Sequence, residues 1–314
     1  MCLFFLYSHR TMCMTKQKGE GNMKVNGPMI FHHMQKYFHV DYMHASQKNF
    51  VKIPILYSRF FNMDEHIVLV NSQDLADCLN RVKNAVVICL DKPETIPDCK
   101  SNDLLILDDN MADAMSFNIL NHVLDQFMEW DSALNHILFK SMSYLEMINT
   151  ISEMLELPCA LCDHDFRYIA YSDHSGEYIQ YVDDQNQLTP NDVSALLEQE
   201  DFARLENIHE AFYYNVIEPS IIKNVYANGT YVGRIATMIK NAPEDEEYAK
   251  AILNHAASYI ESLYNMSDSF SNTSVKYKQI HNYLLQILGE LPVIPDLFKA
   301  SLDAVGCHME DTWQ

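Results

Sequence analysis

The first part of the chain alternates between short apolar runs and one amphipathic segment. Four runs rich in Ile, Val and Leu have the length of buried strands: IPILY, IVLV, AVVICL and LLILDD, at residues 53–57, 67–70, 85–90 and 104–109. Between the second and third runs, Asn71 or Ser72 can cap a helix whose apolar face is formed by Leu75, Leu79 and Val82. Alternation of strands and helix predicts a small N-terminal α/β domain over residues 23–115.

A long helical pattern follows. Between Phe117 and Leu157 apolar residues recur every three or four positions, and neither Pro nor Gly occurs. One continuous helix of this length would extend roughly 60 Å at about 1.5 Å per residue. We interpret residues 116–156 as a long helical connector that carries a signal or dimerises through a coiled-coil seam. The alternative is a single break that leaves two ordinary amphipathic helices.

At Pro158 the helical spacing of apolar residues ends, and strand-length apolar runs follow. LPCALCDHDFRYIAYS contains two strand-length runs around a turn at 163–165, and YANGTYVGRIATMI places Asn228-Gly229 between alternating runs, a strong hairpin signal. A helix is expected to begin after Thr189, because Pro190 and an acidic residue follow it, and another is expected from about Pro243. Residues 157–266 are therefore predicted to form an antiparallel sheet with flanking helices.

The composition of the chain argues against several classes of function. The formal net charge is -21, which argues against a broad phosphate-binding surface, since affinity for DNA comes largely from Lys and Arg. Glycines number only 8, and the nucleotide-binding, zinc-protease and hydrolase motifs are absent from the sequence. We therefore expect no cofactor and no enzymatic activity. With no secretion signal and no membrane-spanning segment in the sequence, we expect a cytoplasmic protein with reduced cysteines.

Both ends of the chain are expected to lie outside the sensing part. Residues 1–22 are interpreted as a non-native or disordered leader, because the codons for KGEGN can contain a ribosome-binding sequence before Met23. N-terminal sequencing of the natural product tests this. A polar linker, SDSFSNTS, precedes residues 275–314, which are interpreted as the helical start of a truncated next domain.

Several of these segments resemble PucR-type (CdaR-like) bacterial transcription regulators. The motifs that carry the likeness are LPCALCDHDFRYIAYS, YANGTYVGRIATMI, EYAKAILNHAASYIESLY and ILGELPVIPDLFKASLDAVGCHMEDTW. The resemblance implies a GAF/PAS-like sensory domain over 157–266 and an N-terminal sensing domain before it. It further implies a small-molecule effector and a homodimer formed through helices. Members of the family end in a helix-turn-helix, so DNA would be bound only through a C-terminal domain absent from this chain.

Two other classes of protein stay open. One is the input domain of a sensor kinase or cyclase, and the other is a free-standing metabolite-binding enzyme. The DNA that follows the codon of Gln314 distinguishes them, because a basic helix-turn-helix, a kinase or cyclase block, or a stop would each indicate a different class.

Candidate site residues gather around the two predicted hairpins. Cys159 and Cys162 form a C-x-x-C, but residues three apart on a strand point to opposite faces and no second ligand pair exists, which favours packing over metal or redox chemistry. Asp163, His164, Asp165 and His174 can bind a cation, but we favour a turn, in which the aspartate side chains bond nearby backbone amides. We predict no metal site. Aromatic and arginine side chains can instead hold a planar or anionic metabolite, and the predicted ligand-binding residues are Arg167, Tyr168, Tyr171, Tyr213, Tyr231 and Arg234. The alternative is that these tyrosines fill the core.

Overall fold

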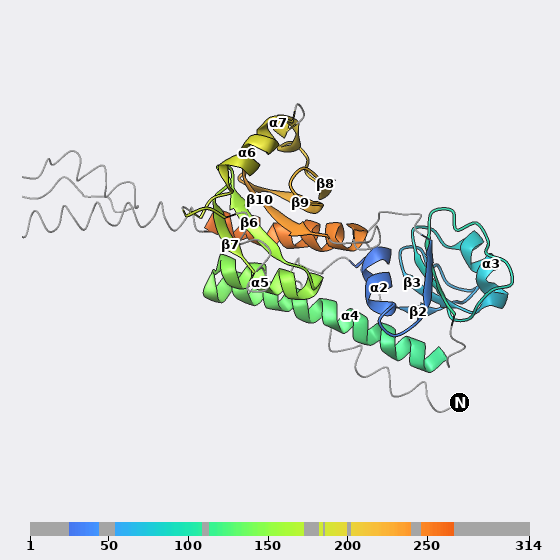
Figure 1. Ribbon diagram of the computed structural model, residues 1–314. Helices are drawn as coiled ribbons and strands as arrows, with labels where there is room; N and C mark the ends of the chain where they lie inside the picture. Colours follow the sequence, from blue (N-terminus) through green and yellow to red (C-terminus); the bar gives the residue numbers. More distant parts are fainter. Residues whose placement is uncertain are drawn as a thin grey trace, which may run out of the picture. The chain divides into compact units, whose positions relative to one another are not determined.

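The computed structural model describes residues 25–43, 54–108, 113–172, 182–184, 186–199, 202–239 and 246–266. They form two compact units, which are described separately (Figure 1). Unit 1 takes residues up to 135 and 239–255, and unit 2 takes 136–238 and the residues from 256. The interpretations of residues 1–22 and 275–314 fall outside the described residues. None of the described helices combines the length and the apolar character needed to cross a bilayer.

Unit 1 is built on a five-stranded sheet in the order β1-β5-β4-β3-β2. Strands β2 (Ile55–Leu56), β3 (Ile67–Val70), β4 (Val86–Cys89) and β5 (Asp103–Leu107) run parallel, and β1 (Val40–Met43) pairs antiparallel with β5. Helix α3 (Ser72–Arg81) connects β3 to β4, and its N-cap is Asn71. The predicted α/β alternation is confirmed. The edge strand β1 was not predicted, because its four residues are only partly buried and lack an apolar run.

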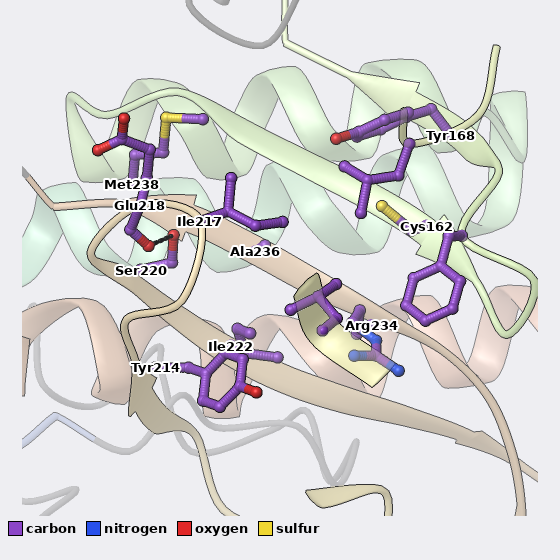
Figure 2. A pocket seen from close by; sticks show the side chains of 13 residues that line it. Cys162, Tyr168, Tyr214, Ile217, Glu218, Ser220, Ile222, Arg234, Ala236 and Met238 are labelled. Atoms are coloured by element: carbon purple, nitrogen blue, oxygen red, sulfur yellow. Dashed lines mark hydrogen bonds between the residues drawn. The ribbon is translucent and has the colours of Figure 1, made fainter. Parts of the chain in front are cut away.

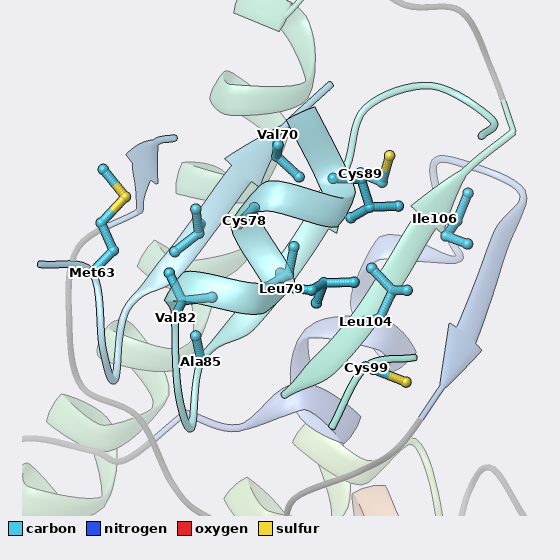
Figure 3. Packing of buried hydrophobic residues seen from close by; sticks show 13 residues of the cluster. Met63, Val70, Cys78, Leu79, Val82, Ala85, Cys89, Cys99, Leu104 and Ile106 are labelled. Atoms are coloured by element: carbon cyan, nitrogen blue, oxygen red, sulfur yellow. The ribbon is translucent and has the colours of Figure 1, made fainter. Parts of the chain in front are cut away.

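The three central strands are apolar throughout because both faces of the sheet are covered. Every residue of β3, β4 and β5 is buried. Alternate residues pack against α3, where Leu75, Cys78 and Leu79 meet Val68, Val70, Val87, Cys89, Leu104 and Ile106 (Figure 3). The opposite face contacts α2 (Gly27–Met34), whose N-cap Asn26 accepts a hydrogen bond from the Met29 amide.

The long helical pattern contains a break. Helix α4 (Asp113–His136) continues as a π-helical turn, η1 (Ile137–Ser141), and a new helix, α5 (Tyr144–Leu155), begins with Ser143 as its N-cap. Met142 between them has the left-handed conformation, with φ 49°. The segment therefore breaks once and forms two helices, and its role as a connector stays a prediction. The sequence has no Pro or Gly at the break. The break is made by the left-handed backbone of Met142 and by Ser143, the N-cap of α5.

Unit 2 is built on a second five-stranded sheet, which is antiparallel throughout. Its strands are β6 (Cys159–Asp163), β7 (Tyr168–Tyr171), β8 (Phe212–Tyr214), β9 (Ser220–Ala227) and β10 (Thr230–Met238), in the order β7-β6-β10-β9-β8. Both predicted hairpins are present. The β9–β10 turn has positive φ at Asn228 and Gly229, 50° and 78°, as the tightest hairpin turns require.

Helices lie on both sides of this sheet. Helix α5 packs on β6 and β7, whereas α6 (Pro190–Leu197) and α7 (Phe202–Leu205) lie on the opposite side (Figure 1). The helix over 246–266 reaches the β9–β10 hairpin, where the Tyr226 amide donates to Glu261 and the Asn228 amide donates to Asn265. The predicted fold class is confirmed as a mixed α+β chain with an antiparallel sheet domain and flanking helices.

Candidate pocket on the antiparallel sheet

A pocket of about 90 Å³ lies in unit 2, between the sheet and the segment that connects β7 to β9 (Figure 2). All five strands contribute to its lining, and the connecting segment adds Leu188, Leu196, Ile217 and Glu218. On β10 the alternation of side chains turns every second residue toward the pocket: Arg234, Ala236 and Met238. The volume is small beside the roughly 300–1,000 Å³ of sites for drug-sized molecules.

Arg234 is the cation of this pocket and is only 7% exposed. It lies on a central strand, paired with Cys162 on β6 and Asn224 on β9. Its Nε donates to the hydroxyl of Tyr231 at 2.8 Å, and Nη2 donates to the same oxygen. Burial raises the pKa of Tyr231, with Arg234 acting in the opposite direction, so the phenol stays neutral at physiological pH. The guanidinium is thus held by a neutral acceptor.

The hairpin turn between β6 and β7 closes over this arginine. The Arg234 guanidinium carbon lies 5.2 Å from the centre of the Phe166 ring, a cation–π distance. Phe166 has a left-handed backbone, φ 64°, which the turn maintains through Asp163: its Oδ1 accepts from the amides of Asp165 and Arg167. The turn interpretation is therefore confirmed for Asp163.

The same turn is tied to the segment that covers the pocket. The Leu188 amide donates to the carbonyl of Phe166 at 2.9 Å, and the Tyr168 amide donates to the carbonyl of Asn186 at 2.9 Å. Helix α6 then starts with Thr189 as N-cap and Pro190 in its first turn, as predicted, and brings Leu196 to the pocket. A change at Phe166 can consequently reach α6 through a few backbone hydrogen bonds.

Cys162, Glu218 and Ser220 lie near the two ends of the pocket. Cys162 faces it beside Arg234, and burial raises the pKa of its thiol to about 12. Glu218, which is exposed, and Ser220 lie toward the other end with Met238 (Figure 2). The Ser220 hydroxyl donates to the carbonyl of Glu218 at 2.9 Å. A positive charge at one end, a negative charge at the other and apolar side chains between them make the pocket electrically asymmetric.

The six predicted ligand-binding residues are distributed unevenly around this pocket. Tyr168 and Arg234 line it, and Tyr231 contacts Arg234 directly. Tyr171 packs against the cluster formed by Ala160, Tyr168, Leu188, Leu196 and Leu205. Arg167 is exposed on the hairpin, and Tyr213 is 43% exposed on β8; neither of them lines the pocket.

Sequence reasoning missed the apolar wall from the connecting segment. Leu188 and Leu196 are far from both hairpins in the sequence, Ile217 precedes β9 by three residues, and no motif marks any of them. Phe166 was also missed, although its position directly after the Asp-His-Asp turn was a usable signal, since a turn residue next to a strand can fold back over the sheet.

The cysteines of the C-x-x-C do not converge. Cys159 is fully buried, with Cys162 on the pocket face of the same strand, as expected for residues three apart. All of the cysteines that the structure describes are free thiols. Within the described part of the chain, no group of three or more His, Cys, Asp or Glu side chains is arranged to hold a metal ion. Packing accounts for Cys159 in the described structure.

Comparison with known proteins gives only remote likenesses. No family model and no curated protein matches the sequence. Among solved structures, the chain is similar to the cofactor-binding GAF domain of the nutrient sensor CodY from Clostridium difficile, with 10% identity, a TM-score of 0.28, and coverage of 45% of this chain and 96% of that one. It is also similar to the bacteriophytochrome RpBphP3 from R. palustris, with 11% identity, a TM-score of 0.28, and coverage of 58% and 46%. At these TM-scores the likenesses carry no assignment of fold or ligand.

Proposed function

We propose that this chain is the ligand-sensing and dimerising portion of a PucR-type transcription regulator that works in the cytoplasm. The observation that carries the proposal is the buried guanidinium of Arg234, which faces a small and otherwise largely apolar pocket. A largely apolar pocket with a few polar groups in its lining is the usual form of a small-molecule site, which suggests a binding role. The bound molecule is a small metabolite.

The proposed role is binding without chemistry. The thiol of Cys162 lines the pocket, and its pKa of about 12 leaves almost no thiolate at neutral pH. The thiolate is the reactive form of cysteine, so this group is poorly suited to covalent catalysis.

Helices would relay the binding event. The hairpin turn above Arg234 is bonded to the segment that leads into α6, and α5 packs directly on the hairpin strands β6 and β7. A ligand that favours one arrangement of these elements shifts the population toward it. We propose that this shift changes the helical contacts of a homodimer, and that a DNA-binding domain outside this chain reads the change.

A thermal-shift screen of purines, sugar acids and amino acids tests the binding role. A ligand that binds only the folded chain raises its melting temperature as concentration increases. Ala236→Leu fills the pocket from β10 and is expected to abolish the shift, whereas Ala195→Leu, on α6 but outside the lining, is the matched control. A shift that survives Ala236→Leu contradicts this pocket as the site.

Light scattering with and without the identified ligand tests the relay. A dimer whose dissociation constant changes with the ligand is expected. A strict monomer under both conditions contradicts the helical-dimer mechanism.

A further inference from the structure

We propose a second binding site, in unit 1, for an aromatic oxyanion: a flat ring that carries a carboxylate or a phosphate group. The site is a cavity of about 400 Å³, within the roughly 300–1,000 Å³ of small-molecule sites. Its walls come from two segments, residues 57–64 after β2 and residues 81–83 at the C-terminal end of α3. This site is separate from the pocket of unit 2, and its ligand does not depend on the function proposed for that pocket.

Hydrogen bonds between the two segments hold the walls of the cavity in place. The Asp64 side chain accepts from the Lys83 amide at 2.8 Å, and the Glu65 amide donates to the Lys83 carbonyl at 3.1 Å. Met63 and Val82, one from each segment, belong to the same buried cluster (Figure 3). The walls are therefore formed before a ligand arrives, and little ordering entropy has to be lost on binding.

The positive end of the site is formed by Arg81 and Lys83. The Arg81 Nε donates to one oxygen of Asp77 at 3.0 Å, and the Tyr57 hydroxyl donates to the other at 2.7 Å. Among the residues that the structure describes, neither the Nη atoms of Arg81 nor the ammonium group of Lys83 has a hydrogen-bond or ion-pair partner. These donors are open to an anion, and guanidinium and ammonium groups are the usual partners of carboxylate and phosphate oxygens.

Asp77 keeps this end of the site charged and oriented. The hydrogen bond from Tyr57, followed by the one from Arg81, lowers the pKa of Asp77, and the bond to Asp77 raises the pKa of Arg81. Arg59, which also lines the cavity, is held by Asp74 at 2.9 Å and by Asp77 at 3.0 Å. The described lining thus has three cations against one carboxylate, that of Asp64, in a chain whose net charge is -21.

An aromatic surface lies beside these cations. Phe61 lines the cavity and is 75% exposed, whereas its neighbour Phe60 is 90% exposed and is not part of the lining. Adjacent exposed aromatic side chains are typical of binding surfaces. A flat ring that stacks on Phe61 can place an attached anionic group near Arg81 and Lys83, and such stacking adds to the affinity that the charges supply.

Fluorescence titration of the purified chain with 2-naphthoate and 2-naphthyl phosphate tests the site, with 2-naphthamide as the uncharged molecule of similar shape. At neutral pH and low salt, at least one oxyanion is expected to bind about tenfold or more tightly than the amide, because hydrogen bonds between charged groups are stronger than neutral ones. The tighter of the two oxyanions identifies the preferred anionic group. Equal affinity of the amide and both oxyanions, or no binding of either oxyanion, overturns the proposal.

Two matched pairs of variants locate the binding. Arg81→Gln is expected to reduce the preference for the oxyanion to about threefold or less, whereas Arg167→Gln, the same change at an exposed arginine of unit 2, leaves it intact. Phe61→Leu is expected to weaken binding about fivefold, and Phe60→Leu to change it by less than about twofold. All four side chains are largely exposed, so folding is expected to be preserved.

Equal effects within either pair overturn the assigned site. Ala236→Leu, which fills the pocket of unit 2, is expected to leave the affinity for the oxyanion unchanged. An affinity that falls with Ala236→Leu and not with Arg81→Gln assigns the oxyanion to the pocket of unit 2, and the second site is then wrong.

Discussion

At the scale of single residues, Gly233 is the position where the sheet of unit 2 leaves no room for a side chain. A Cβ atom built there lies 2.1 Å from the carbonyl oxygen of Cys162 and 3.0 Å from the Cα of Asp163. Both neighbours are backbone atoms of β6, so they can move only if the strands separate. Gly229 is different, because its φ of 78° demands glycine on conformational grounds while the space around it is open.

These two glycines make a matched pair for mutation. Gly233→Ala is expected to lower the free energy of unfolding by about 3 kcal/mol or more, since overpacking against backbone cannot relax easily. Gly229→Ala is expected to cost only about 1 kcal/mol, the price of a left-handed alanine. Urea unfolding of the two variants measures the difference. Equal losses of stability, or a larger loss for Gly229→Ala, would show that the close approach of β6 is not what requires glycine at position 233.

The thiol of Cys162 offers a pH-dependent test of the pocket environment. Its pKa is raised to about 12, first by burial, with Arg234 opposing the shift and Asp163 adding to it. A raised pKa means that the folded state holds its proton at pH values where the unfolded chain, with a pKa near 8.5, has lost it. Stability from this group is therefore fully present below about pH 8.5 and is lost as the pH rises toward 12.

Alkylation of Cys162, followed by mass spectrometry of the peptide, measures the effect. In the folded chain the rate is expected to keep rising about tenfold per pH unit between pH 7 and pH 10, because the thiolate fraction is still far from saturation. In denaturant the rate should level off above about pH 9. A plateau at the same pH in both states would contradict the raised pKa.

At the scale of elements, the start of α6 decides how well the pocket is covered. The Thr189 side chain accepts a hydrogen bond from the Asp192 amide, and its hydroxyl donates to the Asp192 carboxylate. This reciprocal arrangement satisfies a free amide in the first helical turn. The helix carries Leu196 to the pocket, so its stability and the integrity of the apolar wall are linked.

Removing this cap is expected to weaken the helix by a predictable amount. Thr189→Ala should lower the free energy of unfolding by about 1 kcal/mol, whereas Thr189→Ser, which keeps the hydroxyl, should stay within about 0.5 kcal/mol. Chemical denaturation compares the two, and hydrogen exchange of residues 190–197 shows whether the loss is local. If alanine and serine behave alike, the hydroxyl does not cap this helix.

Elements with local signals could be predicted from the sequence, and elements made by distant contacts could not. The Asn228-Gly229 turn, the cap of α6 and the apolar strands of unit 1 each carry their signal within a few residues. Strand β8 has only three residues, and its pairing with β9 is what makes it a strand. The same holds for the site, where Arg234 belongs to a recognisable hairpin but the wall facing it comes from a segment more than fifteen residues earlier in the chain.

At the scale of the whole molecule, the dominant feature is the excess of negative charge. The chain carries 43 acidic against 22 basic residues, and its sequence pI is about 4.9. Such an excess opposes the compact state through self-repulsion and also opposes association with nucleic acid. The sensing chain by itself is therefore expected to have no measurable affinity for duplex DNA at physiological salt, and a fluorescently labelled duplex titrated with the protein tests this.

The same excess makes stability dependent on salt. Raising NaCl from 0.02 M to about 0.5 M shortens the screening length from roughly 20 Å to about 4 Å, so repulsion between carboxylates on separate elements is largely removed. The melting temperature is expected to rise by several degrees, mostly below about 0.2 M, where the screening length falls fastest. Tetramethylammonium chloride at equal ionic strength is the control, because a screening effect is the same for both salts and binding of sodium ions is not. A flat or falling melting temperature would mean that favourable ion pairs, such as the contact between Lys92 and Asp108 at 2.9 Å, outweigh the net repulsion of the chain.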